Sequence, residues 1–495
     1  MRTLVVLALF FLSSCHLGPR YQEPSTAVPE EWKTSTRDAS TDLAENWWEI
    51  FEDPELASLE QRVLENNRDL YVALEKVAES RAVAGVAKSG LYPQVYLTPS
   101  FNNMNELIEL YGVPQGLFPG LKTITRVKEQ FYQLPISMGY EVDLWGKFRG
   151  TYNAANIYAQ AQDEAVRVTW LTVSTEAASH YFNLRALDTQ LDLLKEIEAL
   201  RKKIVDLMRS RFEAGLVSYL DYLEAEKLLN DTDAEYQETL RQRALFENAI
   251  AALLGTLASE FHLPHNPLVL EPPEIPAGLP SELLIRRPDL AQAERNMASF
   301  HEWIGVAYST YFPGILLTSA LGYSSPDLSN FVTWMGRLWQ IGVNISQVLF
   351  NGGRNKAYVD AAYARFNEAK GSYEQAVFTA FQEVEDALTN VKQYHSQWSS
   401  LQNAYQCSFD FSKLSATRYE KGIVNYLQAL DAERAEIDAK RQSMNALGQR
   451  YQASIQLIKA LGGGWEGEAP ISDASCSIDD LQINPEESEM PRLRE

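Results

Sequence analysis

The chain carries a near copy of one segment. Residues 211–227 read RFEAGLVSYLDYLEAEK, and residues 418–434, which begin 207 positions later, read RYEKGIVNYLQALDAER. In each copy a glycine, Gly215 or Gly422, follows a helical pattern and can adopt the left-handed conformation that ends a helix. A Ser or Asn three residues later is a good N-cap for a second helix. The two copies therefore predict two helix–glycine–helix turns in an internally duplicated chain.

The duplication extends beyond these turns. Further matching segments follow in the same order in both halves: residues 67–70 with 287–290, 89–93 with 309–313, 144–149 with 349–354, and 254–255 with 461–462. We therefore expect a first structural repeat over 67–263 and a second over 281–462, joined by a Pro-rich linker at 264–280. The acidic tail at 463–495 is expected to be irregular.

The N-terminus resembles a bacterial lipoprotein signal. An apolar run of nine residues, Leu4–Leu12, follows a basic start and is too short for a bilayer, which needs about 20. Residues 1–14 are therefore predicted to be a cleaved signal peptide. Leu-Ser-Ser-Cys fits a lipobox that makes Cys15 the lipidated first residue; the alternative is an ordinary cysteine. His16 replaces the Asp that retains lipoproteins at the inner membrane, which favours the outer membrane.

Residues 15–66 are expected to form this lipidated linker followed by a short helix that starts at Asp53–Pro54. Beyond it, each repeat contains two stretches with an alternation of apolar and polar residues, a period of two. They predict strands at about 94–102 and 132–144, and at about 315–323 and 338–349. Strands of about ten residues with one apolar face are typical of transmembrane barrels. An amphipathic sheet in a soluble domain would give the same pattern.

Four long helices are predicted at 147–211, 219–254, 353–421 and 426–461. The first and third contain no proline and would each extend on the order of 90–100 Å. Apolar residues recur at threes and fours along them, as in coiled coils. Each shorter helix is expected to return antiparallel to its longer partner across the glycine turn.

Four strands cannot close a barrel, because the smallest barrels need about eight. An open edge in a bilayer leaves backbone groups unpaired, at several kcal/mol each. If these strands lie in a membrane, several chains must share one barrel, and a cyclic trimer would supply twelve strands. The predicted fold is mainly α, with a shared transmembrane β-barrel continued by a tube of long helices.

Several segments together resemble a known family. They are residues 12–15 (LSSC), 47–54 (WWEIFEDP), 91–94 (LYPQ), 143–147 (DLWGK), 286–290 (RRPDL), 349–354 (LFNGGR) and 460–465 (ALGGGW), with the two glycine turns. The chain resembles the TolC-like outer membrane efflux protein family, and within it the OprM-like lipoprotein branch. The resemblance implies a homotrimer with a 12-stranded barrel in the Gram-negative outer membrane and a periplasmic α-helical barrel, lipid-anchored on the periplasmic side.

The same resemblance implies partners and a gate. The partners are a periplasmic adaptor protein and an inner membrane transporter of the resistance-nodulation-division type, which together form a tripartite pump for drugs or other small molecules. The gate residues are Leu427, Asp431 and Arg434, which share one helix face. Read without the resemblance, Leu427 is a coiled-coil position and the other two are a solvated pair. Gln428 stands where some members have a second Asp.

Other functions find little support in the sequence. The net charge of −22 argues against binding to nucleic acid. Catalytic motifs are missing, and His262 and His265 lie in a Pro-rich segment without further ligands, so we expect no enzyme, metal or cofactor. Cys407 and Cys476 are expected to be free thiols. The alternatives are a duct for type I protein secretion or metal efflux, and a periplasmic coiled-coil scaffold without a channel.

Overall fold

The computed structural model describes residues 17–24, 29, 32–33, 46–109, 124–268, 271–275, 283–284 and 286–464. Cys15, the predicted lipid attachment site, and Cys476 lie outside these residues. Cys407 is an exposed free thiol.

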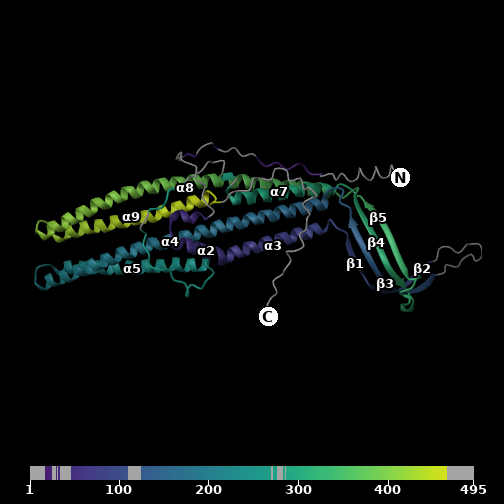
Figure 1. The fold of residues 1–495 in the computed structure, drawn as a ribbon, viewed down its shortest axis with the longest axis horizontal. Helices are drawn as coiled ribbons and strands as arrows, with labels where there is room; N and C mark the ends of the chain where they lie inside the picture. The colour runs from purple at the N-terminus through teal and green to yellow at the C-terminus, as the bar shows by residue number, and fades with distance from the viewer. Residues whose placement is uncertain are drawn as a thin grey trace, which may run out of the picture.

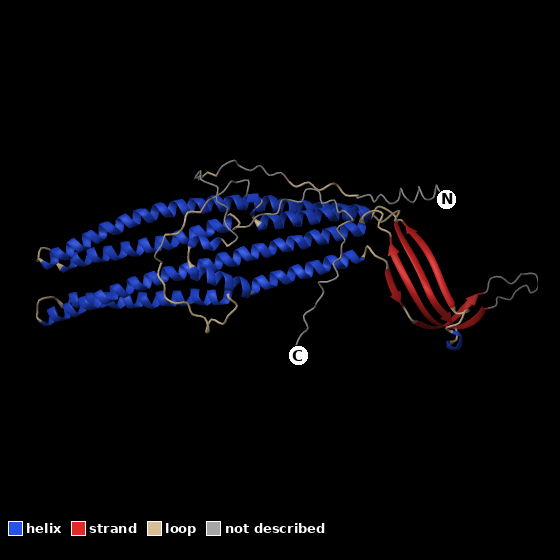
Figure 2. Ribbon diagram, viewed as in Figure 1, coloured by secondary structure: helices blue, strands red, loops and turns tan. Residues whose placement is uncertain are grey.

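The molecule is an elongated bundle of helices with a β-sheet at one end (Figure 1). Figure 2 shows that the two long helical hairpins run away from the sheet and turn at the opposite end of the molecule. The described helices are η1 Trp47–Phe51, α2 Pro54–Asn66, α3 Arg68–Ser89, α4 Lys147–Glu213, α5 Tyr219–Leu253, α7 Pro288–Ser309, η2 Leu328–Asn330, α8 Arg354–Glu420 and α9 Tyr426–Ala460. None of the described helices is long and apolar enough to cross a membrane.

Corresponding helices in the two halves have equal lengths. Both α3 and α7 have 22 residues, both α4 and α8 have 67, and both α5 and α9 have 35. The long helices lie within two residues of the predicted bounds at each end. Each residue of α4 or α5 therefore has a counterpart 207 positions later, and each residue of α3 has one 220 positions later.

The two halves also join their helices in the same way. Asn67 caps α3, because its Oδ1 accepts hydrogen bonds from the backbone N–H groups of Asp69 and Leu70. Its Nδ2 donates to the carbonyl of Leu253 at 2.9 Å. In the second half Arg287 stands at this position, and its Nη1 donates to the carbonyl of Ala460 at 2.9 Å. Leu253 and Ala460 are the last residues of α5 and α9. The start of α3 is thus fixed to the end of α5, and the start of α7 to the end of α9.

The sheet consists of β1 Gln94–Leu97, β2 Ser100–Glu109, β3 Ile124–Glu141, β4 Gly314–Ser325 and β5 Arg337–Ser346. Its order is β1-β3-β4-β5, with β2 also paired to β3, and all of these pairs are antiparallel. Among the described residues the sheet therefore has two unpaired edges, one formed by β1 and β2 and the other by β5.

The strand prediction was wrong in detail. The first predicted strand is interrupted at Thr98–Pro99 and continues to Glu109, while β3 already begins at Ile124. The register does not slip at the interruption, because Leu97 pairs with Ile136 and Ser100 with Gln133. Proline has no N–H to donate, which explains the break.

The other strands also end differently from the prediction. β5 ends at Ser346, before the predicted end at 349, because β4 begins at Gly314 and offers no further residue to pair. β3 ends at Glu141, before the predicted end at 144, although the N–H of Val142 still donates to the carbonyl of Ile315 at 2.8 Å. β4 itself is longer than predicted by one residue at its start and two at its end.

One face of the sheet is apolar and is not covered by the part of the chain that the structure describes. The clearest part of it is β5, where every second residue is apolar and at least 62% exposed: Trp339, Ile341, Val343 and Ile345. An exposed apolar face of this size marks an interaction with another apolar surface.

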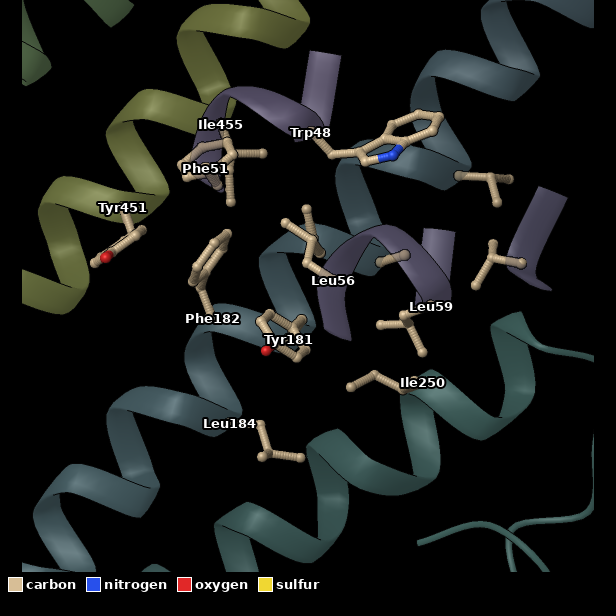
Figure 3. Packing of buried hydrophobic residues seen from close by; sticks show 14 of the residues in the cluster. Trp48, Phe51, Leu56, Leu59, Tyr181, Phe182, Leu184, Ile250, Tyr451 and Ile455 are labelled. Carbon is tan, nitrogen blue, oxygen red and sulfur yellow. The ribbon is translucent and has the colours of Figure 1, made fainter. Parts of the chain in front are cut away.

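The best-packed core lies midway along the helices and holds the two halves together. Trp48 and Phe51 of η1 and Leu56 of α2 enter between α4, α5 and α9 (Figure 3). Phe182 of α4 stacks on Tyr451 of α9, with ring centroids 4.4 Å apart. Because η1 and α2 contact both halves, this N-terminal segment closes the core that the duplication alone leaves open.

Candidate gate at the hairpin tips

The two turns at the hairpin tips have the same backbone geometry. Gly215 and Gly422 have φ values of +72° and +71°. In each turn the glycine N–H and the next N–H donate to carbonyls three and five residues earlier, at 2.9 Å. A Cβ on either glycine would meet no atom within 4 Å. The glycines are therefore needed for their backbone conformation, which other residues adopt at a cost, and not to relieve crowding.

The helices that leave these turns begin differently. Ser218 and Asp221 form a reciprocal capping box at the start of α5. At the start of α9, the side chain of Asn425 accepts a hydrogen bond from the N–H of Gln428 at 2.9 Å. Gln428 is the counterpart of Asp221, so the second tip has one half of the capping arrangement. The first turn of α9 is consequently the less firmly fixed of the two.

The predicted gate residues lie on α9 just beyond this turn. Leu427 is 51% exposed, and Asp431 is exposed without an ion-pair partner among the described residues. Arg434 is half-buried and donates from Nη2 to Oε1 of Glu224 on α5 at 3.1 Å. Arg434 thus pairs with the other hairpin of its own chain and not with Asp431. Glu224 was missed in the sequence, although it occupies the position in the first repeat that Asp431 occupies in the second.

Further polar contacts join the two tips. Nη1 of Arg211 donates to the hydroxyl of Tyr419, and the guanidinium lies over the Tyr419 ring. Deeper in the hairpin, burial raises the pKa of the Glu433 carboxyl, and nearby Arg201 opposes that effect. The Arg434–Glu224 pair is 37% exposed on both sides, so it contributes at most about 1 kcal/mol. Contacts of this strength hold two hairpins together and still allow them to separate.

The segment with the two histidines is fixed by buried charge. Asp188 of α4 is fully buried and accepts hydrogen bonds from Arg185 at 3.1 Å and from Arg243 of α5 at 2.6 Å. His265 lies between Asp188 and Asp192, with ring nitrogens 3.1 and 2.8 Å from the carboxylate oxygens. In the described part of the chain no group of three or more His, Cys, Asp or Glu could hold a metal ion. Sequence reasoning missed Asp188, because nothing distinguishes one acidic residue on a long helix.

Comparison with known proteins identifies the family. Residues 59–256 and 279–463 match the profile of the outer membrane efflux proteins. The chain belongs to the outer membrane efflux protein family.

Individual relatives agree with this assignment. The chain is 30% identical to the solvent efflux pump outer membrane protein SrpC of Pseudomonas putida, over 94% of this chain and 98% of the relative. It is also 30% identical to the cation efflux system protein CusC of Escherichia coli, over 92% and 97%. The solved structure of the outer-membrane channel OprN is similar, with a TM-score of 0.83 and 28% identity over 91% of this chain and all of that one. The predicted resemblance is confirmed, and the fold is TolC-like.

Proposed function

We propose that this outer membrane efflux protein is the exit duct of a tripartite pump. It would act as a homotrimer with a 12-stranded barrel. Each chain would contribute four positions, because β1 and β2 follow one another along the same side of β3 and count as one strand. It would receive drugs or other small molecules from an inner membrane transporter of the resistance-nodulation-division type, through a periplasmic adaptor protein. The observation that carries the proposal is the sheet, which has two open edges and an uncovered apolar face.

The physical argument is one of closure. In a bilayer, unpaired backbone groups at a strand edge cost several kcal/mol each. The edges at β1–β2 and at β5 can pair only with another chain, since one chain has too few strands for a barrel. Repeating the pairing around a threefold axis removes every edge. The apolar side chains on the outer face of β5 would then meet lipid.

The described N-terminal residues support an anchor at Cys15. Trp32 packs on Phe381 of α8, and Tyr21 packs on His301 of α7. His301 lies closer to the sheet than Phe381 does. From Trp32 toward the N-terminus the chain therefore approaches the sheet. His301 lies about 12 Å from the end of α7 at Ser309, at 1.5 Å per residue, whereas six extended residues reach about 20 Å. Cys15 can thus reach the level at which the sheet, and with it the membrane, begins.

The anchor is tested by metabolic labelling with a palmitate analogue. The wild type should be labelled and Cys15→Ser should not, while Cys407→Ser serves as the matched control and keeps the label. Equal labelling of the wild type and Cys15→Ser would remove the anchor from the proposal. Part of the function should survive in Cys15→Ser, since the barrel itself holds the protein in the membrane.

The duct is tested by mass and by conductance. In mild detergent the full-length protein should have the mass of three chains, and in planar bilayers it should form discrete channels. A stable monomer with its full β-sheet content would contradict the shared barrel. A trimer without conductance in any gate variant would contradict the duct and favour a scaffold.

A duct for metal ions is the second candidate. It is favoured by the similarity to CusC, whose name describes a cation efflux protein. The two cargoes are separated by complementation, in which this protein replaces the outer membrane component of a drug pump or of a cation pump. Restored resistance to metal salts alone would favour the second candidate.

A further inference from the structure

The connection between β4 and β5 exposes large apolar side chains. Residues 326–336 form this connection, which includes the short helix η2 and lies at the end of the sheet opposite to the helical bundle (Figure 2). Four of its side chains, Leu328, Val332, Trp334 and Met335, are between 65% and 93% exposed. On a folded protein an exposed apolar cluster marks contact with another apolar surface.

The connection is held in one shape by its own hydrogen bonds. The N–H of Ser324 donates to the carbonyl of Gly336 at 2.7 Å, and the hydroxyl of Thr333 donates to the carbonyl of Asn330 at 2.7 Å. A Cβ on Gly336 would lie 2.6 Å from the carbonyl oxygen of Phe331, so the backbone closes tightly there. This shape keeps the apolar side chains at the surface.

Two ring contacts show over which face of the sheet the connection bends. Tyr323 of β4 and Arg337 of β5 are paired directly, and the alternation of side chains places both on the apolar face that includes Trp339. The rings of Tyr323 and Phe331 have centroids 6.1 Å apart. The guanidinium of Arg337 lies 3.8 Å from the centre of the Trp334 ring. The connection therefore bends over the apolar face and not over the polar one.

The apolar face ends at the level of this connection. On β2 and β3 the rings of Phe101 and Tyr132 lie 4.8 Å apart, and the next pair on the same face, Asn103 and Gln130, is polar. Nε2 of Gln130 donates to the carbonyl of Pro326, where the connection begins, at 3.2 Å. If the apolar face meets lipid, this is the level of the headgroups, where Trp and Tyr are enriched.

Arg337 adds a positive charge at this level. Its side chain is exposed and stacks on Trp334, and a guanidinium that stacks through its face keeps its N–H groups free at its edge. Among the described residues it has no ion-pair partner. A guanidinium binds a phosphate through two parallel hydrogen bonds. A cation at the end of an apolar band is thus complementary to a lipid that carries phosphate.

We propose that residues 326–337 insert into the outer membrane leaflet that faces away from the helices, and that Arg337 binds the phosphate of a phosphorylated lipid there. Val332, Trp334 and Met335 would lie at the boundary between headgroups and acyl chains. The inference rests on the proposed trimeric duct and goes beyond it by assigning the residues that recognise lipid.

Insertion is tested with spin labels on the full-length protein in vesicles of phosphatidylethanolamine and lipid A. Val332→Cys and Met335→Cys are labelled in a Cys407→Ser, Cys476→Ser background, and the background alone is the blank. Both labels should collide more often with oxygen, which dissolves in lipid, than with a water-soluble nickel complex. The matched control is Leu216→Cys at a hairpin tip, where the wild-type side chain is 75% exposed and the nickel complex should dominate.

Phosphate recognition is tested by native mass spectrometry of the full-length trimer with bisphosphorylated and monophosphorylated lipid A. The wild type should prefer the bisphosphorylated form. Arg337→Gln should weaken its binding about fivefold, the effect of one cation near an anionic lipid surface. Arg209→Gln, an exposed position near a hairpin tip, should bind like the wild type. Equal binding by Arg337→Gln, or displacement of the lipid by an equal concentration of inorganic phosphate, would overturn the assignment of Arg337.

The mass and conductance of each variant separate this inference from the proposed function. A conducting trimer whose labels at 332 and 335 meet the nickel complex as often as the label at 216 overturns the insertion and leaves the duct standing. Labels shielded from both oxygen and the nickel complex would show a protein contact in place of lipid, which also overturns the insertion. A monomer overturns both proposals.

Discussion

The helices α4 and α8 have the same length and the same place in their repeats. Yet α4 lies at the centre of a packed core, whereas the described residues leave one face of α8 exposed. The main neighbours of α4 are α3, α5, α7 and α9, whereas those of α8 are α7 and α9. Two duplicated helices of equal length therefore pack in two different environments, one enclosed and one partly exposed. The comparison teaches that α4 is enclosed by its own chain, whereas the described residues leave much of α8 exposed.

The largest expected difference between the repeats concerns the buried charge on α4. Asp188→Ala should lower the free energy of unfolding by about 3–5 kcal/mol, because it removes the buried carboxylate that Arg185 and Arg243 share and leaves each with one more distant or more exposed acidic partner, Glu55 or Glu247. Its counterpart in the second repeat is His395, which is exposed, and His395→Ala should change stability by less than about 0.5 kcal/mol. Denaturant unfolding followed by circular dichroism measures both. Similar losses in the two variants would contradict the asymmetry.

A smaller difference is expected in apolar packing. Leu184 of α4 is fully buried, whereas its counterpart Val391 of α8 is half-buried. Leu184→Ala should destabilise the fold by about 3 kcal/mol through lost burial and a remaining cavity. Val391→Ala should cost about 1 kcal/mol. The same unfolding measurement applies, and a greater loss for Val391→Ala would reverse the comparison.

Glu60 of α2, which covers the core at α4, should make stability depend on pH. The carboxyl group is fully buried, and burial raises its pKa well above the ordinary value, although a backbone contact at Ala178 acts in the opposite direction. Between the ordinary and the raised pKa the folded state holds a proton that the unfolded state has released. Stability is therefore highest below the ordinary pKa and falls as pH rises, by up to about 1.4 kcal/mol per pH unit.

This expectation is checked by unfolding at several pH values. Glu60→Gln should weaken the dependence above the ordinary carboxyl pKa, leaving the part that comes from other buried carboxyls such as Glu433, whereas Glu65→Gln, an exposed position on the same helix, should keep it in full. An unchanged pH profile in Glu60→Gln would show that another group carries the effect.

The smallest effect on stability is expected at the tips, where the difference between repeats should appear in conductance. Leu427→Ala should raise single-channel conductance by widening an apolar constriction, whereas Leu220→Ala, its counterpart in the first hairpin, should not. Neither variant should change stability by more than about 1 kcal/mol, since both side chains are at least half exposed. Equal conductance changes in both would place the gate elsewhere.

Asp431→Ala sharpens the same test through charge. Loss of an acidic ring should weaken cation selectivity. The change should shrink as salt rises, because the Debye length falls from about 10 Å at 0.1 M to about 3 Å at 1 M. The Leu427→Ala effect should not depend on salt in this way.

Much of the fold could be predicted because the duplication repeats each sequence pattern that indicates a helix or a turn. The paired glycine turns at Gly215 and Gly422 indicated both hairpins, and proline-free periodic stretches gave the long helices to within two residues. The strand ends could not be predicted, since they depend on pairing with distant segments, as at Ser346 where β4 offers no further residue, and on the break at Pro99. Polar residues such as Asn103 and Asn105 also hid the extension of β2, because pairing with β3 overrides their weak strand preference.

The candidate site was predictable only in part. The spacing of Leu427, Asp431 and Arg434 placed them on one helix face, but spacing along one helix cannot say which neighbour a side chain will meet. Arg434 pairs with Glu224, a residue 210 positions away in the sequence. Contacts of this kind depend on how two hairpins lie side by side, which no local pattern in the sequence encodes.

The equal lengths of α4 and α8 give both hairpins the same reach. At 1.5 Å per residue a helix of 67 residues measures about 100 Å, and this length fixes how far the tips stand from the sheet. Loss of seven residues from α4 alone would withdraw one tip by about 10 Å and leave the other in place. Both tips can therefore move together only if both long helices and both return helices change in length together.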